Sequence, residues 1–259
     1  MERLRRKIGL ARAGGGGGGA HVSELAGQTV AIVGASSGIG LATAKAAAAQ
    51  GATTVLLSRS QARLDEAARA VPGTTRAVAM DMLDEAAVGR AMSAVGAIDH
   101  LVLTAVGDEY EFSGPIAELT AEQLERSLDK LRGYVTVTRA AVPRIRERGS
   151  ITLLSGAGAA RPPKGTSFPA AANGAIVSFG RALALELAPL RVNVVMPGLV
   201  DTPLHGEKRA ALAAWAESPA LPARRFGQAD DIAHAIVFLM TNRYVTGHTL
   251  VVDGGLLAG

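Results

Sequence analysis

Short apolar runs alternate with segments of helical periodicity along most of the chain. Apolar runs of this length, separated by helices, are typical of strands that are buried on both faces of a parallel sheet. The predicted strands are 29–33, 54–57, 76–79, 100–104, 150–154, 191–195 and 249–252. Seven strands in one uninterrupted alternation predict a single α/β domain whose parallel sheet carries helices on both faces.

Two long stretches between these strands have a helical pattern, at about 121–145 and at about 170–187. The segment 203–222 differs from both, because several Pro and Gly residues flank a short alanine-rich run there. A segment of this kind after a late strand suits a lid over a site at the carboxyl ends of the strands. We therefore expect residues 203–222 to form a substrate lid.

Composition restricts the kinds of chemistry that the chain can perform. The chain has 259 residues, a length that suits one α/β domain with a large core. With 48% hydrophobic but only 3% aromatic residues, this core must consist mostly of Ala, Val, Leu and Ile. The chain contains no Cys, which excludes disulfides, thiol nucleophiles and thiolate metal sites. No apolar run reaches membrane length, so we expect a soluble protein without a membrane partner.

The net charge of +4 is concentrated at the start of the chain. Residues 1–20 carry a clear basic excess, whereas the remaining acidic and basic side chains balance. A basic tail can touch nucleic acid or an anionic surface, yet a short solvated tail is the commoner case. Six consecutive glycines at 14–19 favour a flexible linker, and no apolar signal core precedes them. We expect a disordered tail at 1–24, one domain at 25–259, a cytoplasmic location and no nucleic-acid partner.

A glycine-rich turn follows the first predicted strand. Gly34, Gly38 and Gly40 lie between that strand and an alanine-rich helical run that starts at Leu41. Glycines at such a turn permit a tight bend, a close approach of the backbone to a pyrophosphate and close packing of the helix on the sheet. The N–H groups of the first helical turn then face the phosphates. One such turn is weak evidence, but it predicts a dinucleotide site.

Further motifs make the chain resemble the short-chain dehydrogenase/reductase family from about residue 25 onward. The turn at 33–40 is similar to the family's glycine motif, although Val33 stands in place of its usual Thr. Asp81 matches the acidic residue that holds the adenine ring, and residues 192–202 resemble the segment around the nicotinamide. Thr246-Gly247 and residues 252–255 resemble the carboxyl-terminal signature. The resemblance implies a single Rossmann-like, doubly wound domain with a seven-stranded parallel sheet.

The cofactor-binding residues implied by this resemblance come from several separate segments. They are Gly34, Ser36, Ser37, Gly38, Ile39, Gly40, Ser58, Arg59, Asp81, Met82, Thr104, Ala105, Gly107, Pro197, Gly198, Val200 and Thr202. At the end of the second strand, an NAD-selective relative would carry a carboxylate for the ribose hydroxyls. Arg59 stands there instead, and its planar fork of donors suits the 2′-phosphate of NADP. We therefore expect NADP as the cofactor; the alternative for Arg59 is a solvated side chain at a strand end.

The catalytic positions of the family differ in this chain. The resemblance implies a Tyr as proton donor, a Lys four residues later, a Ser that holds the carbonyl and an Asn in a proton relay. Aligned on residues 181–188, these positions fall on Pro169, Asn173, Gly156 and Lys130. The chain therefore looks like a divergent member that lacks the usual Ser-Tyr-Lys residues. After the fourth strand, Thr104-Ala105-Val106-Gly107 replaces the usual Asn-Asn-Ala-Gly, so we expect the polar network of the two Asn to be lost.

Our candidate for the catalytic residues is a rearranged site made of Lys130, Ser155 and Asn173. Lys130 can polarise a bound carbonyl or contact the nicotinamide ribose, Ser155 can hold a substrate oxygen, and Asn173 can contact the ribose. For Lys130, an ordinary solvated helix lysine is an equally open interpretation, although it has no acidic residue at helical spacing. Tyr110 is a weaker donor candidate. The five His residues lack the spacing of metal ligands, so no metal is expected; His248 is expected at a strand edge.

Several functions are compatible with this fold. We favour an NADP(H)-dependent oxidoreductase that acts on a small, largely apolar carbonyl or alcohol substrate. The alternatives are a non-redox enzyme such as a cyclase or isomerase, and a catalytically silent protein that binds NADP for regulation. The resemblance also implies a homodimer or homotetramer that is built through the helices at 121–145 and 170–187.

Overall fold

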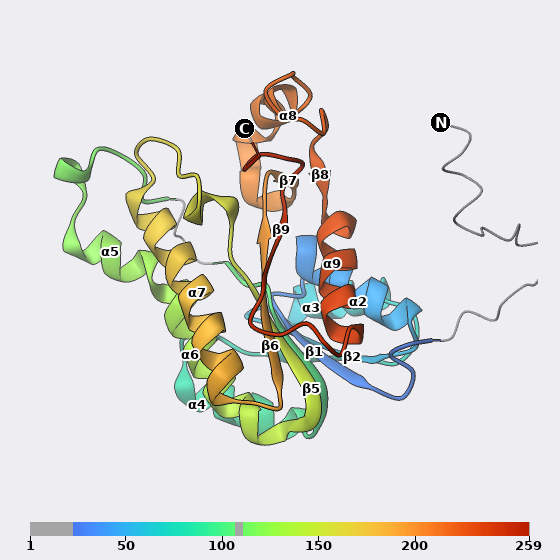
Figure 1. The fold of residues 1–259 in the computed structure, drawn as a ribbon. Coiled ribbons are helices and arrows are strands. Elements are labelled where there is room, and N and C mark those ends of the chain that lie inside the picture. Colours follow the sequence, from blue (N-terminus) through green and yellow to red (C-terminus); the bar gives the residue numbers. More distant parts are fainter. Residues whose placement is uncertain (1–22, 107–110, 259) are drawn as a thin grey trace, which may run out of the picture.

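The protein is described by a computed structural model, which covers residues 23–106 and 111–258 (Figure 1). Seven parallel strands form the main sheet in the order β3-β2-β1-β4-β5-β6-β9. The strands are β1 (Thr29–Val33), β2 (Thr53–Ser58), β3 (Thr75–Ala79), β4 (Ile98–Leu103), β5 (Ile145–Leu154), β6 (Arg191–Pro197) and β9 (Thr249–Val252). The fold prediction, an α/β domain with one seven-stranded parallel sheet, is confirmed.

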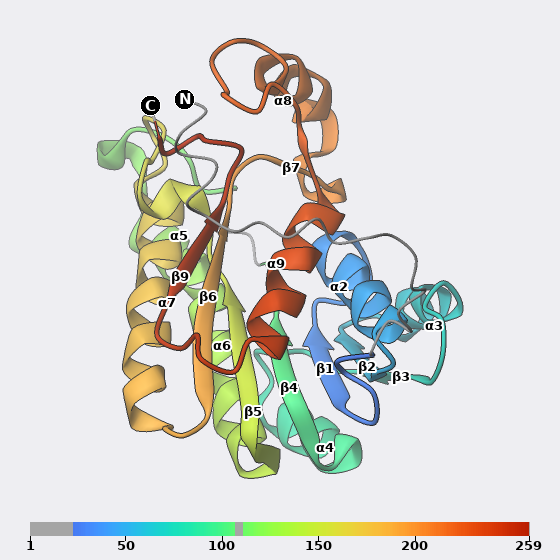
Figure 2. The ribbon, with the colours of Figure 1, turned by 45° about the vertical axis from the view of Figure 1, so that its right-hand side comes forward.

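Helices cover both faces of this sheet (Figures 1 and 2). One face carries α2 (Gly38–Ala49), α3 (Gln61–Arg69) and α9 (Ala229–Thr241), and the other carries α4 (Glu85–Val95), α6 (Asp129–Ala141) and α7 (Ser167–Glu186). The alternation of side chains along β1 divides the core. Val30 and Ile32 pack in the cluster with α2, whereas Ala31 and Val33 pack in the cluster with α4 and α6.

The predicted strands are all present, and most are longer at their ends. β1 and β9 have the predicted bounds. β5 begins at Ile145, five residues before its predicted start, because Ile145 pairs with Ile98 of β4. The register between β4 and β5 shifts between Ile98 and His100, and Gly149 lies at this irregularity. A Cβ on Gly149 would lie 2.1 Å from the backbone oxygen of Asp99, so only glycine fits.

The prediction of one helix at 121–145 is wrong. The segment contains α5 (Ala121–Ser127), then α6, a 3₁₀ turn η2 (Val142–Arg144) and the first residue of β5. Leu128 separates α5 from α6, and its N–H is shared between the carbonyls of Leu124 and Glu125. The helix ends at Ala141 because Pro143 lacks an N–H and its ring obstructs a continuing helix.

The helix predicted at 170–187 is confirmed as α7, which starts slightly earlier, at Ser167. Pro169 lies in its first turn, where the missing N–H is harmless. The Thr166 side chain does not cap the helix, since its hydroxyl donates to the Pro163 carbonyl instead.

The segment 203–222 contains η4 (Pro203–Lys208) and the alanine-rich helix α8 (Arg209–Ala216). It lies between the two strands of a short sheet, β7 (Val200–Asp201) and β8 (Gly227–Gln228). In both views α8 stands beyond the carboxyl ends of the main strands (Figures 1 and 2). This position is compatible with a lid, and the function of the segment stays a prediction, as does the tail, of which residues 1–22 lie outside the described residues.

The order of the strands reverses direction at β1 and β4. The chain moves from β1 outward to β2 and β3, then returns to place β4 on the other side of β1. In open α/β sheets, ligands bind beyond the carboxyl ends of the strands at such a reversal. The topology therefore predicts a ligand site beyond the carboxyl ends of β1 and β4.

Candidate functional site

The carboxyl ends of the strands bring together segments that are far apart in the sequence. The predicted cofactor-binding residues within the described ranges lie at or just beyond these ends. They are Gly34, Ser36, Ser37, Gly38, Ile39 and Gly40 after β1, Ser58 and Arg59 at β2, Asp81 and Met82 after β3, Thr104 and Ala105 after β4, and Pro197, Gly198, Val200 and Thr202 at and after β6. Gly107 lies outside the described residues.

The glycine turn after β1 is closely packed. Gly34 has φ +88°, and a Cβ on it would lie 2.5 Å from the backbone nitrogen of Ala105. A Cβ on Gly40 would lie 2.3 Å from the Gly34 oxygen and 2.6 Å from the Thr104 hydroxyl oxygen. Any side chain at either position would push α2 away from the sheet. These two glycines therefore hold the amino end of α2 directly against the ends of β1 and β4.

The amino end of α2 has the donor chemistry that a phosphate requires. Ser37 is the N-cap residue, but its side chain makes no capping hydrogen bond. The first N–H groups of a helix have no partners within the helix, so an uncapped helix end leaves donors for an anion. Thr202 lies opposite, since its Cγ2 would be 3.4 Å from a Cβ on Gly38. The donors at this helix end fit a dinucleotide pyrophosphate, and Thr202 borders the same turn.

The end of β2 forms the next part of the site. Arg59 is exposed there, and Ser60 caps α3 by accepting a hydrogen bond from the Arg63 N–H at 3.4 Å. The Arg63 guanidinium reaches back to the glycine turn and donates to the Ser37 hydroxyl at 3.4 Å. The Ser58 hydroxyl is buried and has no hydrogen-bond partner. Sequence reasoning missed Arg63, because an arginine on an exposed helix face resembles any solvated one.

Asp81, the predicted adenine-side acid, is exposed and accepts a hydrogen bond from the Leu83 N–H at 3.0 Å. This bond fixes the turn after β3. Gly133 of α6 packs against the neighbouring Met82, whose sulfur would lie 2.5 Å from a Cβ on that glycine. The loop is therefore held by its own backbone on one side and by α6 on the other.

The three predicted catalytic residues lie in one hydrogen-bonded cluster. The Lys130 Nζ donates to the Asn173 Oδ1 at 2.8 Å, and the Ser155 hydroxyl donates to the Asn173 carbonyl at 2.8 Å. Lys130 and Asn173 are each 1% exposed, and Ser155 is 4% exposed. The interpretation of Lys130 as a solvated helix lysine is wrong. We refer to Lys130, Ser155 and Asn173 below as the Lys130 cluster.

Three elements position the Lys130 cluster. Lys130 lies on the buried face of α6 together with Gly133, Tyr134 and Val137, which is the spacing of one helical face. Ser155 follows the end of β5, and Asn173 is on α7. The Asn173 side chain also donates through Nδ2 to the Pro169 carbonyl at 2.9 Å. The amide is thus oriented with its oxygen toward the lysine, and the cluster combines a buried cation with a hydroxyl at the carboxyl edge of the sheet.

Hydrogen bonds from Thr104 and Tyr134 hold the loop after β4, where the two Asn of the family are absent. The Thr104 hydroxyl donates to the Val33 carbonyl at 2.8 Å, and the buried Tyr134 hydroxyl donates to the Ala105 carbonyl at 2.9 Å. Tyr134 is therefore occupied in supporting this loop. Tyr244 is 99% exposed between α9 and β9, and the donor candidate Tyr110 lies outside the described residues. Gly156, at the predicted Ser position, precedes the 3₁₀ turn η3 (Ala157–Ala159).

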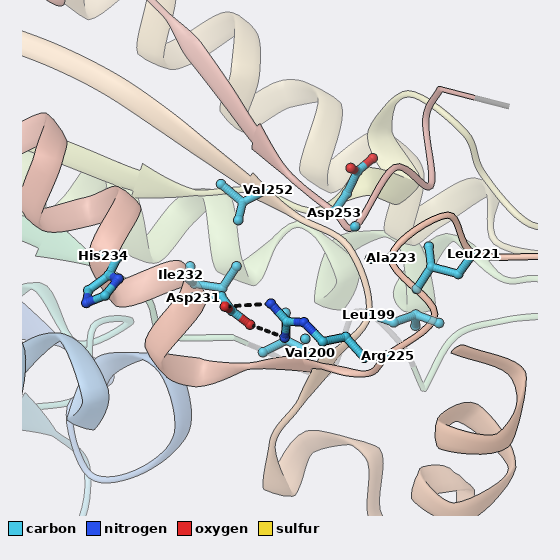
Figure 3. Close-up of a pocket in the computed structure, with 12 residues that line it drawn as sticks. Leu199, Val200, Leu221, Ala223, Arg225, Asp231, Ile232, His234, Val252 and Asp253 are labelled. Carbon is cyan, nitrogen blue, oxygen red and sulfur yellow. Dashed lines mark hydrogen bonds and ion pairs between the residues drawn. The ribbon is translucent and has the colours of Figure 1, made fainter. Parts of the chain in front are cut away.

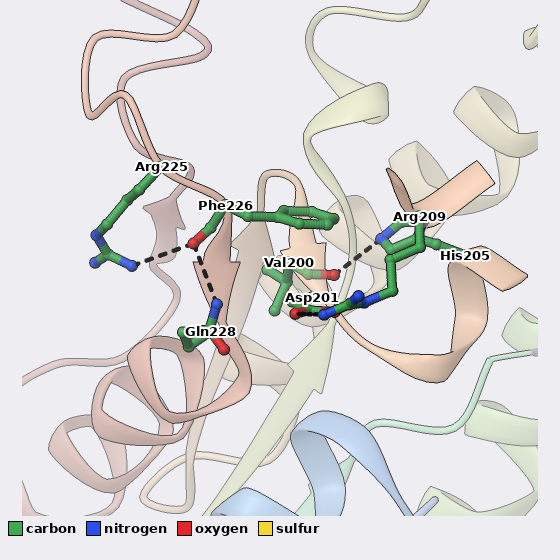
Figure 4. A network of polar contacts seen from close by, with 7 residues as sticks. All are labelled: Val200, Asp201, His205, Arg209, Arg225, Phe226 and Gln228. Atoms are coloured by element: carbon green, nitrogen blue, oxygen red, sulfur yellow. Dashed lines mark hydrogen bonds and ion pairs between the residues drawn. The ribbon is translucent and has the colours of Figure 1, made fainter. Parts of the chain in front are cut away.

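Polar contacts hold residues 203–222, the predicted lid and called the lid segment below, to β7 (Figure 4). Arg209 of α8 donates to both carboxylate oxygens of Asp201, and the His205 Nε2 lies 2.8 Å from the Val200 carbonyl oxygen. The hydrogen bond from Arg209 lowers the pKa of the Asp201 carboxyl. The His205 ring also packs on Phe226, with ring centroids 5.6 Å apart. These contacts fix the base of the lid segment.

A small cavity of about 200 Å³ lies between β7, β8, α9 and the carboxyl-terminal segment (Figure 3). Arg225 and Asp231 line it and form a bidentate ion pair with N–O distances of 2.7 and 2.8 Å. That hydrogen bonding lowers the pKa of the Asp231 carboxyl. The cavity shares no lining residue with the Lys130 cluster. Asp253 also lines it, and its carboxylate accepts hydrogen bonds from the Gly255 and Leu257 N–H groups.

The described residues contain neither a candidate metal site nor a candidate membrane-spanning helix. No group of three or more His, Cys, Asp or Glu side chains there is arranged to hold a metal ion. His248 directly precedes β9, the edge strand, as expected. No helix within residues 23–106 and 111–258 has both the length and the apolar character needed to cross a membrane.

Comparisons with known proteins agree with this arrangement. A family model described as enoyl-(acyl carrier protein) reductase matches residues 34–257. L-xylulose reductase of Bos taurus is 33% identical over 250 residues, which cover 91% of this chain and 98% of the relative.

Solved structures give the same result. A reductase/Diels-Alderase, MalC of Malbranchea aurantiaca, superposes with a TM-score of 0.83 at 27% identity, covering 92% of this chain and 99% of that one. A small-chain dehydrogenase crystallised in complex with NADPH superposes with a TM-score of 0.76 at 30% identity, covering 90% and 99%.

Proposed function

Because the chain belongs to the short-chain dehydrogenase/reductase family of oxidoreductases, we propose a function within that family. We propose that the chain is an NADP(H)-dependent enzyme with an atypical active site. Its substrate is a small, largely apolar carbonyl or alcohol compound. The observation that carries this proposal is the Lys130 cluster, in which a buried ammonium lies 2.8 Å from Asn173 at the edge of the sheet where the glycine turn also lies.

The choice of NADP is supported by charge at the end of β2. Arg59 is exposed there, and neither Ser58 nor Ser60 offers a carboxylate to the ribose hydroxyls of NAD. A guanidinium binds a phosphate through two parallel hydrogen bonds. The structural relative that was crystallised with NADPH is in keeping with this choice. When bound, NADP(H) would supply the hydride-transfer chemistry, held by the glycine turn, Arg59 and the residues around Thr202.

The residues of the Lys130 cluster suit the proton transfer that must accompany hydride transfer. A carbonyl oxygen gains negative charge during reduction and then needs a proton. The Lys130 ammonium supplies a positive charge inside the protein, where charges interact strongly, and it carries a transferable proton. The Ser155 hydroxyl donates to the Asn173 carbonyl, so its oxygen is oriented to accept a hydrogen bond from an alcohol substrate.

The same cluster accounts for the altered positions in the chain. Where the family resemblance implies a Lys on α7, Asn173 is present, and where it implies an Asn on α6, Lys130 is present. We propose that the two residues have exchanged places, so that the cation enters the site from α6 instead of α7. Pro169 occupies the position implied for the Tyr, so the proton donor must be another group, and Lys130 is our first candidate.

The lid segment supports an apolar substrate. Leu204 on η4 and Trp215 on α8 are 47% and 40% exposed, so the segment presents two large apolar side chains to its surroundings. Such side chains gain stability when an apolar compound covers them.

The test has two steps. NADPH binding is first measured by fluorescence, and single-turnover reactions are then followed with a panel of ketones, enones and imines. We expect NADPH binding below millimolar concentration and its oxidation by at least one substrate class. If NADPH binds and no substrate reacts, a regulatory NADP-binding protein is the better explanation.

A second candidate is a non-redox enzyme, such as a cyclase, that uses the same pocket. One structural relative is described as both a reductase and a Diels-Alderase, so a ring-forming activity exists on a similar fold. This alternative predicts product formation from a suitable substrate without any consumption of NADPH. Failure to bind NADPH would also favour it.

A further inference from the structure

Arg63 lies closer to the glycine turn than its place in the sequence suggests. It is an exposed residue in the first turn of α3, and its Nη2 is 3.4 Å from the hydroxyl oxygen of Ser37, the residue just before α2. A hydrogen bond of this length between side chains on an exposed surface is weak. The guanidinium therefore extends over the end of β2 toward the amino end of α2 without being firmly bound there.

Ser58 provides a second observation at the same place. Its hydroxyl oxygen is buried and has no hydrogen-bond partner. Leu56, two residues earlier on β2, packs in the cluster formed with α2 and α3, so alternation along the strand directs the Ser58 side chain toward the same helices. Buried polar groups are nearly always satisfied, so an orphaned hydroxyl directly before Arg59 indicates a missing hydrogen-bond partner.

The charges around Arg63 point to the same conclusion. In the part of the chain that the structure describes, several arginines pair with carboxylates, among them Arg146 with Asp99 and Arg209 with Asp201. Neither Arg59 nor Arg63 is in such a pair within those residues. The nearby Asp65 carboxylate instead accepts a hydrogen bond from Gln61 at 2.7 Å. Two guanidinium groups without a carboxylate partner among the described residues thus follow the buried Ser58 hydroxyl along the chain, at Arg59 and Arg63.

We propose that Arg63 is a second specificity-determining residue for the 2′-phosphate of NADP(H), together with Arg59. This inference rests on the proposed choice of NADP. The Arg63 guanidinium exchanges its weak contact with Ser37 for a charge-assisted hydrogen bond to the phosphate, and the Ser58 hydroxyl gains an acceptor. Because NAD lacks the 2′-phosphate, the contribution of Arg63 is specific to the phosphorylated cofactor.

The test measures binding without turnover. Affinities for NADPH, NADH and adenosine 2′,5′-bisphosphate are determined by calorimetry or fluorescence for the full chain and for Arg63→Ala, Arg63→Lys and Arg59→Ala. Arg63→Ala should weaken NADPH and the bisphosphate by about tenfold or more, with NADH changed less than about twofold. Arg63→Lys should recover part of the loss, because it keeps the charge without the planar fork.

Arg69→Ala is the matched control, since Arg69 is an exposed arginine in the last turn of the same helix. It should change none of the three affinities. The proposal is overturned if Arg63→Ala leaves the bisphosphate affinity unchanged while Arg59→Ala lowers it. Equal weakening of NADH and NADPH by Arg63→Ala would also overturn it, because the residue would then support the turn itself.

The outcomes separate this inference from the proposed function. If neither Arg59→Ala nor Arg63→Ala changes bisphosphate binding, both this inference and the choice of NADP fail. A protein that binds the bisphosphate through Arg63 but oxidises NADPH with no substrate would retain this inference and lose the proposed oxidoreductase activity.

Discussion

Lys130 has an unusual environment for a lysine. It is 1% exposed on α6 and donates to Asn173 at 2.8 Å. Lysine is rarely buried unless its charge is compensated, and ionisable groups with unusual environments concentrate at functional sites. The helical spacing of Lys130 from the apolar residues Val137 and Tyr134 placed it on the core face, and this signal was available in the sequence.

Replacing Lys130 by Met tests its role. Lys130→Met keeps much of the side-chain volume and removes the charge and the proton. Turnover should fall by roughly 100-fold or more, as for the loss of a general acid, while NADPH affinity changes little. The free energy of unfolding should change by about 1–3 kcal/mol at most, the cost of leaving the Asn173 oxygen without this donor.

The control for this variant is Lys45→Met, which removes an exposed lysine on α2. It should leave turnover unchanged. A Lys130→Met enzyme with normal turnover would remove Lys130 from the mechanism, and a chemical denaturation curve for each variant distinguishes lost chemistry from lost folding.

His100 gives a pH dependence of stability. Burial, followed by the charge of Arg191, lowers the pKa of His100 from 6.5 to about 4. The neutral ring is held between Ser150 and Gln28 at 2.8 and 2.7 Å. The folded state resists protonation, so this stabilisation is complete above pH 6.5 and is lost as the pH falls toward about 4.

We expect the free energy of unfolding to fall by on the order of 3 kcal/mol between neutral pH and pH 4 from this residue. Urea unfolding at several pH values measures the slope, which should be smaller in His100→Gln. His234→Gln, at an exposed position on α9, should keep the slope of the unmodified protein. An unchanged slope in His100→Gln would contradict the assignment.

At the scale of elements, the sequence predicted strands better than helix ends. Apolar runs define buried strands, and β1 and β9 therefore have their predicted bounds. The start of β5 could not be read locally, because Arg146, Glu147 and Arg148 look like the end of an amphipathic helix, whereas pairing of Ile145 with Ile98 decides the structure. The end of α6, in contrast, has a local signal, because Pro143 cannot continue a helix.

In the candidate site, too, some features follow from local sequence patterns and others depend on how distant elements pack. The glycine turn and the residues after β2 and β6 follow from local patterns. The bond between Arg63 and Ser37 joins residues 26 positions apart, and its existence depends on how α2 and α3 pack beside each other. No local pattern contains that information.

Arg191 connects β6 to the end of α9, and this connection can be tested. From the start of β6, its guanidinium donates to the Leu239 and Met240 carbonyls at 2.6 and 2.7 Å, in the last turn of α9. A cation at this helix end satisfies carbonyls that lack partners and opposes the negative end of the helix dipole. Arg191→Met should lower the free energy of unfolding by about 2–4 kcal/mol.

The same variant should raise the pKa of His100, because the charge of Arg191 helps to lower it. NMR titration of the His100 ring measures this shift. Arg181→Met, on an exposed position of α7, should alter neither the stability nor the titration. Unchanged stability in Arg191→Met would show that the α9 carbonyls are satisfied by solvent.

At the scale of the whole molecule, we expect a homo-oligomer, and α7 gives the reason. Its outer side carries a stripe of small residues that ends in an apolar one: Ala171, Ala175, Ser178, Ala182 and Leu185. Leu185 is 85% exposed. Small residues allow two helices to approach closely, and an exposed leucine gains stability when a second copy covers it.

Light scattering should therefore give the mass of a dimer or tetramer. Ala182→Arg, which places a large charge on this stripe, should reduce the mass or make it depend on concentration. Ala86→Arg, an exposed position on α4, is the control and should not. A monomeric unmodified protein would contradict the expectation.

The contact between α2 and α9 has a consequence for how the protein is synthesised. The two helices lie side by side over the sheet, although most of the chain separates them (Figure 2). Ala44 and Ala47 of α2 pack in the same cluster as Ile232 and Ile236 of α9. The glycine turn therefore leaves the ribosome early, but its helix stays uncovered until residues 229–241 have been translated. A nascent chain that lacks residues 229–241 holds an unfinished nucleotide cradle, and the native site can form only after α9 has been made.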